Sequence, residues 1–273
     1  MTVINTNVAS LNARAALAGN AAGLQKAMQQ LSTGLRINSA ADDAAGMSIV
    51  NNFTAQIKGL NQAVRNANDG ISMLQTAEGA TNEVTAILQR MRELAVQAAN
   101  GTYSSNDLSS LEKENTALKS ELDRVASVTQ WNGISLMSGS LSASFHVGYG
   151  YASADDVSVT ISQSMTATAL GVSGSISAGG STATAFISAI DAALNTVNGV
   201  RGTLGATINR FQFTADALTN VATHLSESKS RIQDTDYGEA TSDLAKHQVI
   251  QQAATAMLAQ ANQAPQMVLQ LLK

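Results

Sequence analysis

The sequence predicts a mainly α-helical protein: a coiled-coil bundle of long helices with a small β-hairpin, whose terminal helices pair as a coiled coil. Along most of the chain, apolar residues recur at alternating steps of three and four, the spacing of a coiled-coil seam. The 273 residues are 44% hydrophobic but only 4% aromatic, and only one is proline. Such an alanine-rich, proline-poor composition favours long helices with close-packed seams. One short stretch alternates with a period of two instead, which is typical of a hairpin.

Residues 3–35 are predicted to form the first helix, with Asn5 and Asn7 as candidate N-terminal caps. Gly34 interrupts the helical pattern at its end. Two apolar runs of heptad spacing, shifted in phase, follow one another in this segment. Their members are Ile4, Val8, Leu11 and Ala15, then Leu17, Ala21, Leu24, Met28, Leu31 and Leu35.

A long second helix is expected over residues 44–99. Asn38 and Ser39 can cap it, and we interpret Asp42-Asp43 as acidic helix-start residues rather than as paired catalytic carboxylates. The heptad phase slips once, near residues 74–77, which changes the local coiling of a bundle. Three glycines interrupt this helix, and each costs about 1 kcal/mol relative to alanine. Close approach of another helix would explain why they are tolerated: Gly59, Gly70 and Gly79.

A third helix is expected from the capping residues 104–107 to about residue 129, followed by a turn at Trp131-Asn132-Gly133. Residues 140–165 alternate around a short polar link and predict the β-hairpin. A Gly/Ser/Ala-rich connection and a last long helix over 184–233 come next. Tyr237-Gly238 is expected to interrupt the chain before a C-terminal helix that begins near Thr241.

The C-terminal helix carries apolar residues on two faces, so it requires more than one neighbour. Because many of these residues are alanine, pairing the chain ends within one molecule buries little apolar surface. We therefore infer that the ends are marginal in a single chain and become ordered against other copies. The main seam is Ile250, Ala254, Met257, Ala261, Ala264, Val268 and Leu271, and a weaker strip is Leu258, Pro265, Leu269 and Leu272.

Composition argues against several functional classes. The net charge of −4 argues against nucleic acid as a main partner. There is no cysteine, and His146, His224 and His247 do not share metal-ligand spacing, so no metal site is expected. No G-x-S-x-G, Walker or dinucleotide motif is present, so we expect no catalytic residues, no cofactor and no enzyme activity. No run is long enough for membrane insertion, and the N-terminus does not have the pattern of a Sec-type signal peptide.

Several strings in the sequence together form a highly specific signature. They are Val3-Ile4-Asn5-Thr6-Asn7, Leu31-Ser32-Thr33-Gly34-Leu35-Arg36-Ile37-Asn38-Ser39-Ala40, Asp42-Asp43-Ala44-Ala45-Gly46, Ile57-Lys58-Gly59-Leu60, Arg65-Asn66-Ala67-Asn68-Asp69-Gly70-Ile71-Ser72, Leu88-Gln89-Arg90-Met91-Arg92-Glu93-Leu94-Ala95-Val96-Gln97 and Ala259-Gln260-Ala261-Asn262-Gln263, followed by Pro265-Gln266, Val268-Leu269 and Leu271-Leu272. With these strings, which cover about residues 1–140 and 185–273, the chain resembles bacterial flagellin.

The resemblance implies a structural subunit that polymerises with other flagellin subunits into the bacterial flagellar filament for motility. Residues 1–40 plus 240–273 would form the inner helical layer D0, and 41–239 the bundle D1. The hairpin would lie near 140–165. Only the connection near 166–183 stands where larger flagellins insert outer domains. The resemblance also implies export in an unfolded state through the flagellar type III apparatus to the cell exterior, with a flagellar export chaperone and cap and junction proteins as further partners.

A second implication of the resemblance is that host Toll-like receptor 5 binds the monomer. The matching positions are Gln89, Arg90, Leu94 and Glu114. Arg90 and Glu114 would supply charge-assisted hydrogen bonds and Leu94 an apolar anchor. The alternative is that these residues serve D1 packing between subunits.

Two further functions stay open at this point. The chain could be a surface ligand-binding flagellin homologue, for example for a polysaccharide, although no aromatic cluster or acidic pocket supports this. It could also be a hook–filament junction protein present in few copies, which would form short terminal stubs rather than long polymers.

Overall fold

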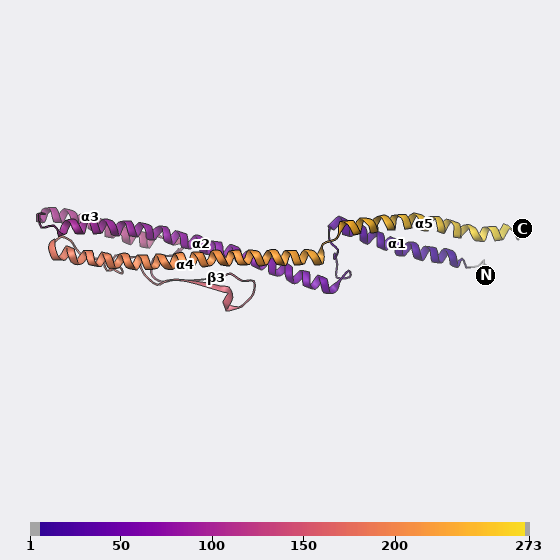
Figure 1. The fold of residues 1–273 in the computed structure, drawn as a ribbon, viewed down its shortest axis with the longest axis horizontal. Coiled ribbons are helices and arrows are strands. Elements are labelled where there is room, and N and C mark those ends of the chain that lie inside the picture. Colours follow the sequence, from indigo (N-terminus) through magenta and orange to yellow (C-terminus); the bar gives the residue numbers. More distant parts are fainter. Residues whose placement is uncertain (1–5, 271–273) are drawn as a thin grey trace. The chain divides into compact units, whose positions relative to one another are not determined.

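The computed structural model describes residues 6–270, apart from the side chains of Ser153 and residues 264–270. Five long helices and short antiparallel strands make up the fold, which confirms the predicted mainly α class with a small hairpin (Figure 1). The elements are α1 Val8–Thr33, α2 Ala44–Ala99, α3 Ser105–Val128, β1 Gln130–Trp131, β2 Ile134–Ser135, β3 Leu141–His146, the 3₁₀ helix η1 Ser153–Asp155, β4 Asp156–Ile161, α4 Gly180–Gln233 and α5 Tyr237–Gln270.

The chain divides into two compact units. The first, the terminal unit, comprises Met1–Ala55 with His224–Lys273, and the second, the bundle unit, comprises Gln56–Thr223. α2 and α4 each contribute residues to both units.

In the terminal unit, α1 and α5 lie side by side and antiparallel (Figure 1). The predicted pairing of the terminal helices is therefore confirmed. Buried and half-buried residues recur with heptad steps on both helices, as expected for a coiled-coil seam. We call these residues the inner seam: Ser10, Ala13, Leu17, Asn20, Leu24, Ala27 and Leu31 on α1, and Ala240, Leu244, His247, Gln251, Ala254, Leu258 and Ala261 on α5.

The ends of these helices follow ordinary capping chemistry. The side-chain oxygen of Asn7 accepts a hydrogen bond from the Ser10 amide at 3.0 Å, so Asn7 is the predicted cap of α1. Asn5, the other candidate, lies outside the described residues. Gly34 ends α1 in the left-handed conformation, with φ of 71°, and its N–H bonds the carbonyl of Gln30.

One predicted boundary is wrong. Tyr237-Gly238 does not interrupt the chain but opens α5, because Asp236 accepts hydrogen bonds from the amides of Gly238 and Glu239. The interruption falls just before it, where Asp234 bridges to Leu35 and the Thr235 amide donates to the Gly34 carbonyl at 3.0 Å.

In the bundle unit, α2, α3, α4 and the hairpin share one hydrophobic core. Phe211 of α4 belongs to this core, has no exposed surface and meets Phe145 of β3 edge-to-face, with 5.4 Å between ring centroids. Gly70 of α2 faces the Phe211 ring of α4, so the expected close approach of another helix holds there. At Gly59 the close neighbour is Tyr149 of the loop after β3, not a helix. The expectation is also wrong at Gly79, which has nothing within 4 Å of an added Cβ.

Both hairpins are antiparallel. β3 pairs with β4 from Leu141↔Ile161 to His146↔Asp156, within the predicted range, and Val157, Val159 and Ile161 point into the core. The predicted turn after residue 130 is the loop of a second, very short hairpin, β1–β2. Asn132 and Gly133 both have positive φ, 47° and 80°, as a two-residue type I′ turn requires.

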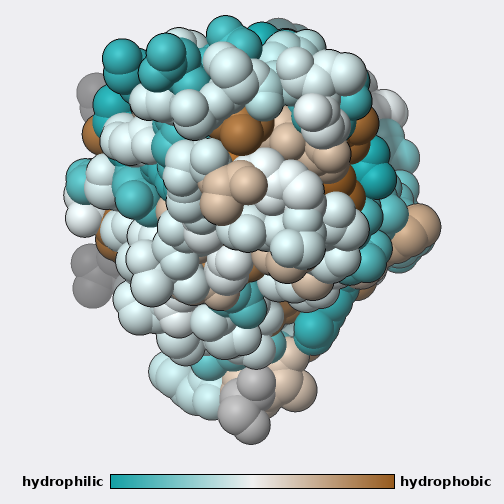
Figure 2. Space-filling model, turned by 90° about the vertical axis from the view of Figure 1, so that its left-hand side faces the viewer, coloured by the Kyte–Doolittle hydropathy of each residue, from teal (hydrophilic) through white to brown (hydrophobic). Residues whose placement is uncertain are grey.

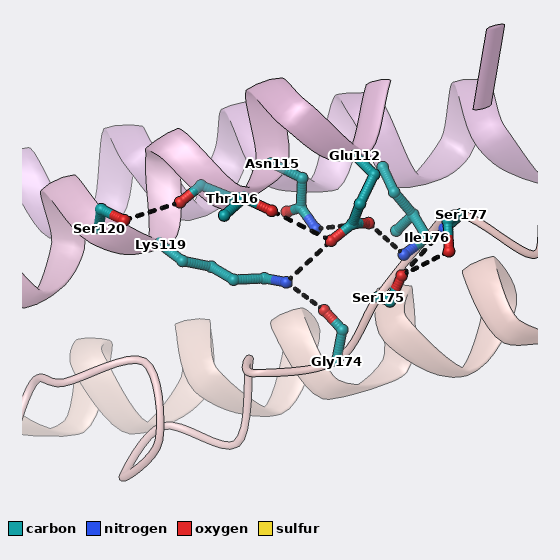
Figure 3. A network of polar contacts seen from close by, with 9 residues as sticks. All are labelled: Glu112, Asn115, Thr116, Lys119, Ser120, Gly174, Ser175, Ile176 and Ser177. Carbon is teal, nitrogen blue, oxygen red and sulfur yellow. Dashed lines mark hydrogen bonds and ion pairs between the residues drawn. The ribbon is translucent and has the colours of Figure 1, made fainter. Parts of the chain in front are cut away.

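The small-residue connection before α4 is held against α3 by a polar network (Figure 3). Glu112 accepts a hydrogen bond from the Ile176 amide at 2.6 Å and pairs with Lys119 at 3.3 Å, and Lys119 also donates to the Gly174 carbonyl. Partial burial acts to raise the pKa of Glu112, but the Ile176 N–H, Lys119 and Asn115 together hold it below its ordinary value. α4 then begins at Gly180, four residues before the predicted start.

Candidate functional site

The terminal helices leave large apolar side chains uncovered. Val8, Leu11 and Met28 on α1 and Val249, Ile250 and Met257 on α5 are exposed, and we call these six side chains the outer apolar residues. They lie off the inner seam, because that seam uses only some members of the predicted apolar runs, such as Leu24 and Leu31, and leaves others, such as Met28, outside. Ile250 and Met257, for example, each precede an inner-seam residue of α5.

From the apolar runs of the two chain ends, twelve residues are predicted to form the self-assembly seam, and in the structure they separate into three groups. Leu24, Leu31 and Ala261 are half-buried in the inner seam, and Leu35 is half-buried beside Asp234. Val8, Leu11, Met28, Ile250 and Met257 are outer apolar residues. Ile4 and Leu271 lie outside the described residues, and so does the side chain of Val268.

A polar pair sits within the inner seam. The Asn20 amide donates to the His247 carbonyl at 2.8 Å, and its oxygen lies 2.7 Å from His247 Nδ1. Because an amide oxygen only accepts, Nδ1 carries the proton that completes the pair. A polar residue at a seam position fixes the register of a coiled coil, since any slip would leave it unpaired. Apolar periodicity did not reveal this pair, although Asn20 inside an apolar run was a visible signal.

Gly23 is a close neighbour of this pair. A Cβ at Gly23 would lie 2.4 Å from Cε1 of His247, so the absence of a side chain makes room for the imidazole. A cavity of about 260 Å³ opens beside it. Lys26 and Arg36 line it from one side, and acidic residues of α5 and the turn before it, among them Glu239 and Asp243, line it from the other.

The four predicted receptor-binding residues are not equivalent in the structure. Gln89 and Arg90 are exposed on α2, and Glu114 is exposed on α3. Arg90 Nη2 lies 2.7 Å from Glu114 Oε1, and Nη1 lies 2.9 Å from Glu93. Arg90 donates hydrogen bonds to Glu93 and to Glu114, and these bonds, that to Glu93 first, raise the pKa of its guanidinium.

Leu94 requires a correction. Its side chain has no exposed surface and belongs to the hydrophobic core of the bundle unit. An anchor must be accessible to its partner, so Leu94 can support this face from below but cannot anchor a receptor in this conformation.

Other kinds of site can be assessed for the described residues only. Among them, no group of three or more His, Cys, Asp or Glu residues is placed to hold a metal ion. Within residues 6–270, none of the helices combines the length and hydropathy that a membrane-crossing segment needs.

The face drawn in Figure 2 carries mainly hydrophilic and intermediate residues, with hydrophobic ones in small separate spots.

Comparison with known proteins identifies the family. The model of the bacterial flagellin N-terminal helical region matches residues 4–142, and that of the C-terminal helical region matches residues 187–272. The residues between these two matches include β4 and the Gly/Ser/Ala-rich connection that leads to α4.

Similar proteins span the whole chain. A flagellin of Halalkalibacterium halodurans is 42% identical over 99% of this chain and 100% of its own length. The flagellar filament 33 kDa core protein of Treponema phagedenis is 40% identical over 99% and 100%. The crystal structure of Bacillus cereus flagellin is 31% identical, covers 60% of this chain and 94% of its own, and superposes with a TM-score of 0.51. The chain therefore belongs to the bacterial flagellin family, in its short form, and is a subunit of a flagellar filament.

Proposed function

We propose that subunits polymerise into an extracellular filament by burying the outer apolar residues of α1 and α5 against neighbouring copies. The observation that carries this proposal is that these two helices, although paired with each other, leave six large non-aromatic apolar side chains exposed among those that the structure describes. Covering such side chains stabilises an assembly by about 1.5–3 kcal/mol for each one fully buried.

The inner seam supports the same proposal. Most of its residues are small or polar, including Ser10, Ala13, Asn20, Ala27 and Gln251. Small and polar seam residues bury little apolar surface, so the α1–α5 pair gains less from its own contacts than a leucine-rich seam would. A second set of contacts, between copies, would supply the stabilisation that the inner seam does not provide.

In this proposal, residues 1–40 with 240–273 form the inner layer D0 of the filament, and 41–239 form D1. The chain reaches the cell exterior unfolded, through the flagellar type III apparatus, with a flagellar export chaperone and cap and junction proteins as partners. A chain without cysteine has no disulfide to open before such a passage. The terminal helices become fully stable only when copies stack.

Seeded elongation tests the assembly step. Leu11→Ser removes one outer apolar residue, while Asn12→Ser makes the same new side chain at the adjacent exposed position. We expect Leu11→Ser to raise the critical concentration for elongation by about tenfold, the equivalent of about 1.4 kcal/mol per subunit, and Asn12→Ser to leave it nearly unchanged. Equal behaviour of the two variants would contradict the proposal.

Truncation provides a second test. A chain that lacks residues 251–273 should keep a folded bundle unit, because the core of that unit draws no residue from α5. It should not elongate seeds. Electron microscopy also distinguishes a filament subunit, which forms long polymers, from a junction protein, which would form short stubs. Polysaccharide-binding assays on monomer and filament would detect a surface ligand-binding homologue.

We also propose that the monomer binds host Toll-like receptor 5 through the face that carries Gln89, Arg90 and Glu114. The supporting observation is that the Arg90–Glu114 ion pair, which spans α2 and α3, is solvent-accessible in the single chain. Arg90→Ala should weaken binding to the receptor ectodomain at least tenfold. Arg124→Ala, which breaks an exposed Arg–Glu pair elsewhere on α3, should not. If Arg90→Ala affects elongation and leaves receptor binding intact, the face serves packing between subunits instead.

A further inference from the structure

We propose that Met28 and Met257 are two redox-sensitive positions, one on each terminal helix, at which peroxide oxidation of the thioether opposes assembly. This inference rests on the proposed polymerisation through the outer apolar residues. Met28 lies on α1 with 55% of its surface exposed, and Met257 lies on α5 with 66% exposed.

The other methionines with described side chains are shielded. Met73, Met91, Met137 and Met165 are at most 2% exposed and belong to the core of the bundle unit, and Met47 is half-buried. Oxidation of methionine follows access to the sulfur. A diffusible oxidant therefore meets the terminal helices first and leaves the core of the bundle unit intact.

Both exposed thioethers border the inner seam. Met28 follows the buried Ala27, and Met257 precedes the half-buried Leu258. Met257 also lies seven residues after Ile250, which places the two side chains on the same side of α5 and two turns apart. A neighbouring copy that covers Ile250 would therefore cover the Met257 sulfur as well.

The chemistry needs only hydrogen peroxide as the oxidant. A sulfur lone pair attacks one peroxide oxygen, an S–O bond forms, and the O–O bond breaks. The second oxygen leaves as hydroxide and becomes water by taking up the proton that the sulfur-bound oxygen loses. The sulfur loses two electrons and the peroxide gains them. The product, methionine sulfoxide, is a polar and chiral group in place of a flexible apolar one.

A sulfoxide at either position opposes assembly rather than folding. In the free subunit the new S=O group can bond to water, so the α1–α5 pair keeps its seam. In a filament the same group would be removed from water in an apolar contact, and an unpaired polar group is costly there. Copies already assembled would shield both sulfurs, so oxidation would act on subunits before they are incorporated.

The experiment uses the full-length chain. Monomer is treated with hydrogen peroxide, the excess is removed with catalase, and each methionine is followed by peptide mass mapping while seeded elongation is measured. We expect Met28 and Met257 to oxidise at least about tenfold faster than the four core methionines. The critical concentration should then rise at least about tenfold, with the helical content of the monomer retained.

The variant Met28→Leu/Met257→Leu keeps the apolar side chains but removes both sulfurs. It should elongate seeds before and after peroxide treatment, and intact filaments should protect Met28 and Met257 from the same dose. The inference is overturned if the double variant remains sensitive, which would assign the effect to other methionines, or if oxidised wild-type protein elongates normally. If untreated wild-type protein fails to elongate seeds, the proposed polymerisation is overturned, and the proposed effect of methionine oxidation fails with it.

Discussion

Two glycines of α2 allow the packing of the bundle unit to be tested with one type of substitution. Replacing a glycine in a helix interior by alanine gains about 1 kcal/mol of helix stability. At Gly79 nothing lies within 4 Å of the new Cβ, so the gain is not opposed. At Gly70 the new Cβ would lie 3.0 Å from Cζ of Phe211 and 3.2 and 3.3 Å from its Cε atoms.

The Phe211 ring cannot simply turn away from that contact. It has no exposed surface, and it also meets the Phe145 ring edge-to-face. Overpacking of a well-filled core costs about 1–3 kcal/mol. Gly70→Ala should therefore be neutral to about 2 kcal/mol destabilising, while Gly79→Ala should be about 1 kcal/mol stabilising.

Urea and thermal denaturation of the monomer, followed by circular dichroism, measure this difference. For a unit of this size, about 1 kcal/mol corresponds to a shift of about 2–4 °C in Tm. Gly79→Ala should melt above wild type and Gly70→Ala at or below it. A third variant, Gly70→Ala with Phe211→Leu, should show a favourable coupling, because the smaller side chain relieves the contact. Equal stabilisation by Gly70→Ala and Gly79→Ala would refute the reasoning.

Three further substitutions test other contacts. Asn20→Ala leaves the His247 N–H without its partner in the inner seam and should destabilise the α1–α5 pair by about 1–3 kcal/mol, detected as faster amide hydrogen exchange in both helices. Glu112→Gln should make the free energy of unfolding depend less on pH in the acid range. The pKa of Glu112 is lowered on folding, so the ionised carboxylate stabilises the fold above its unfolded pKa, and this stabilisation is lost as pH falls through the folded pKa. Wild type should therefore lose more stability than the variant between about pH 6 and pH 3 in denaturation midpoints. Ser104→Ala removes the cap of α3 and should cost about 0.5–2 kcal/mol in the same assay, whereas Ser105→Ala, one residue further on, should change little.

Local chemistry made several elements of this fold predictable. Asn7 and Gly34 bound α1 because a side-chain acceptor and a left-handed residue satisfy the groups that a helix end leaves unpaired. The hairpin was predictable because alternation with a period of two places every second side chain in the core. The start of α5 was misplaced because Tyr237-Gly238 was interpreted as a breaker, whereas Asp236 caps the helix directly before it.

The candidate sites were less predictable than the elements. Leu94 looked like an anchor from its place in a family string, but a helical residue faces core or solvent according to the positions of its neighbours. For the same reason, periodicity identified apolar runs in α1 and α5 without showing which run the partner helix would cover. The Asn20–His247 pair requires two residues that lie 227 positions apart to meet, and no local pattern contains that information.

The sequence alone determined the helical class, the capped ends of α1 and the cap of α3, the hairpin and the membership in the flagellin family, because these depend on side-chain periodicity and on short strings of residues. Only the tertiary structure decided which apolar face of each terminal helix turns inward. The side that turns inward carries the Asn20–His247 pair, small residues and several leucines, and the six outer apolar residues of α1 and α5 stay outside. The surface proposed here to join subunits is thus set by the way the two chain ends pair with each other.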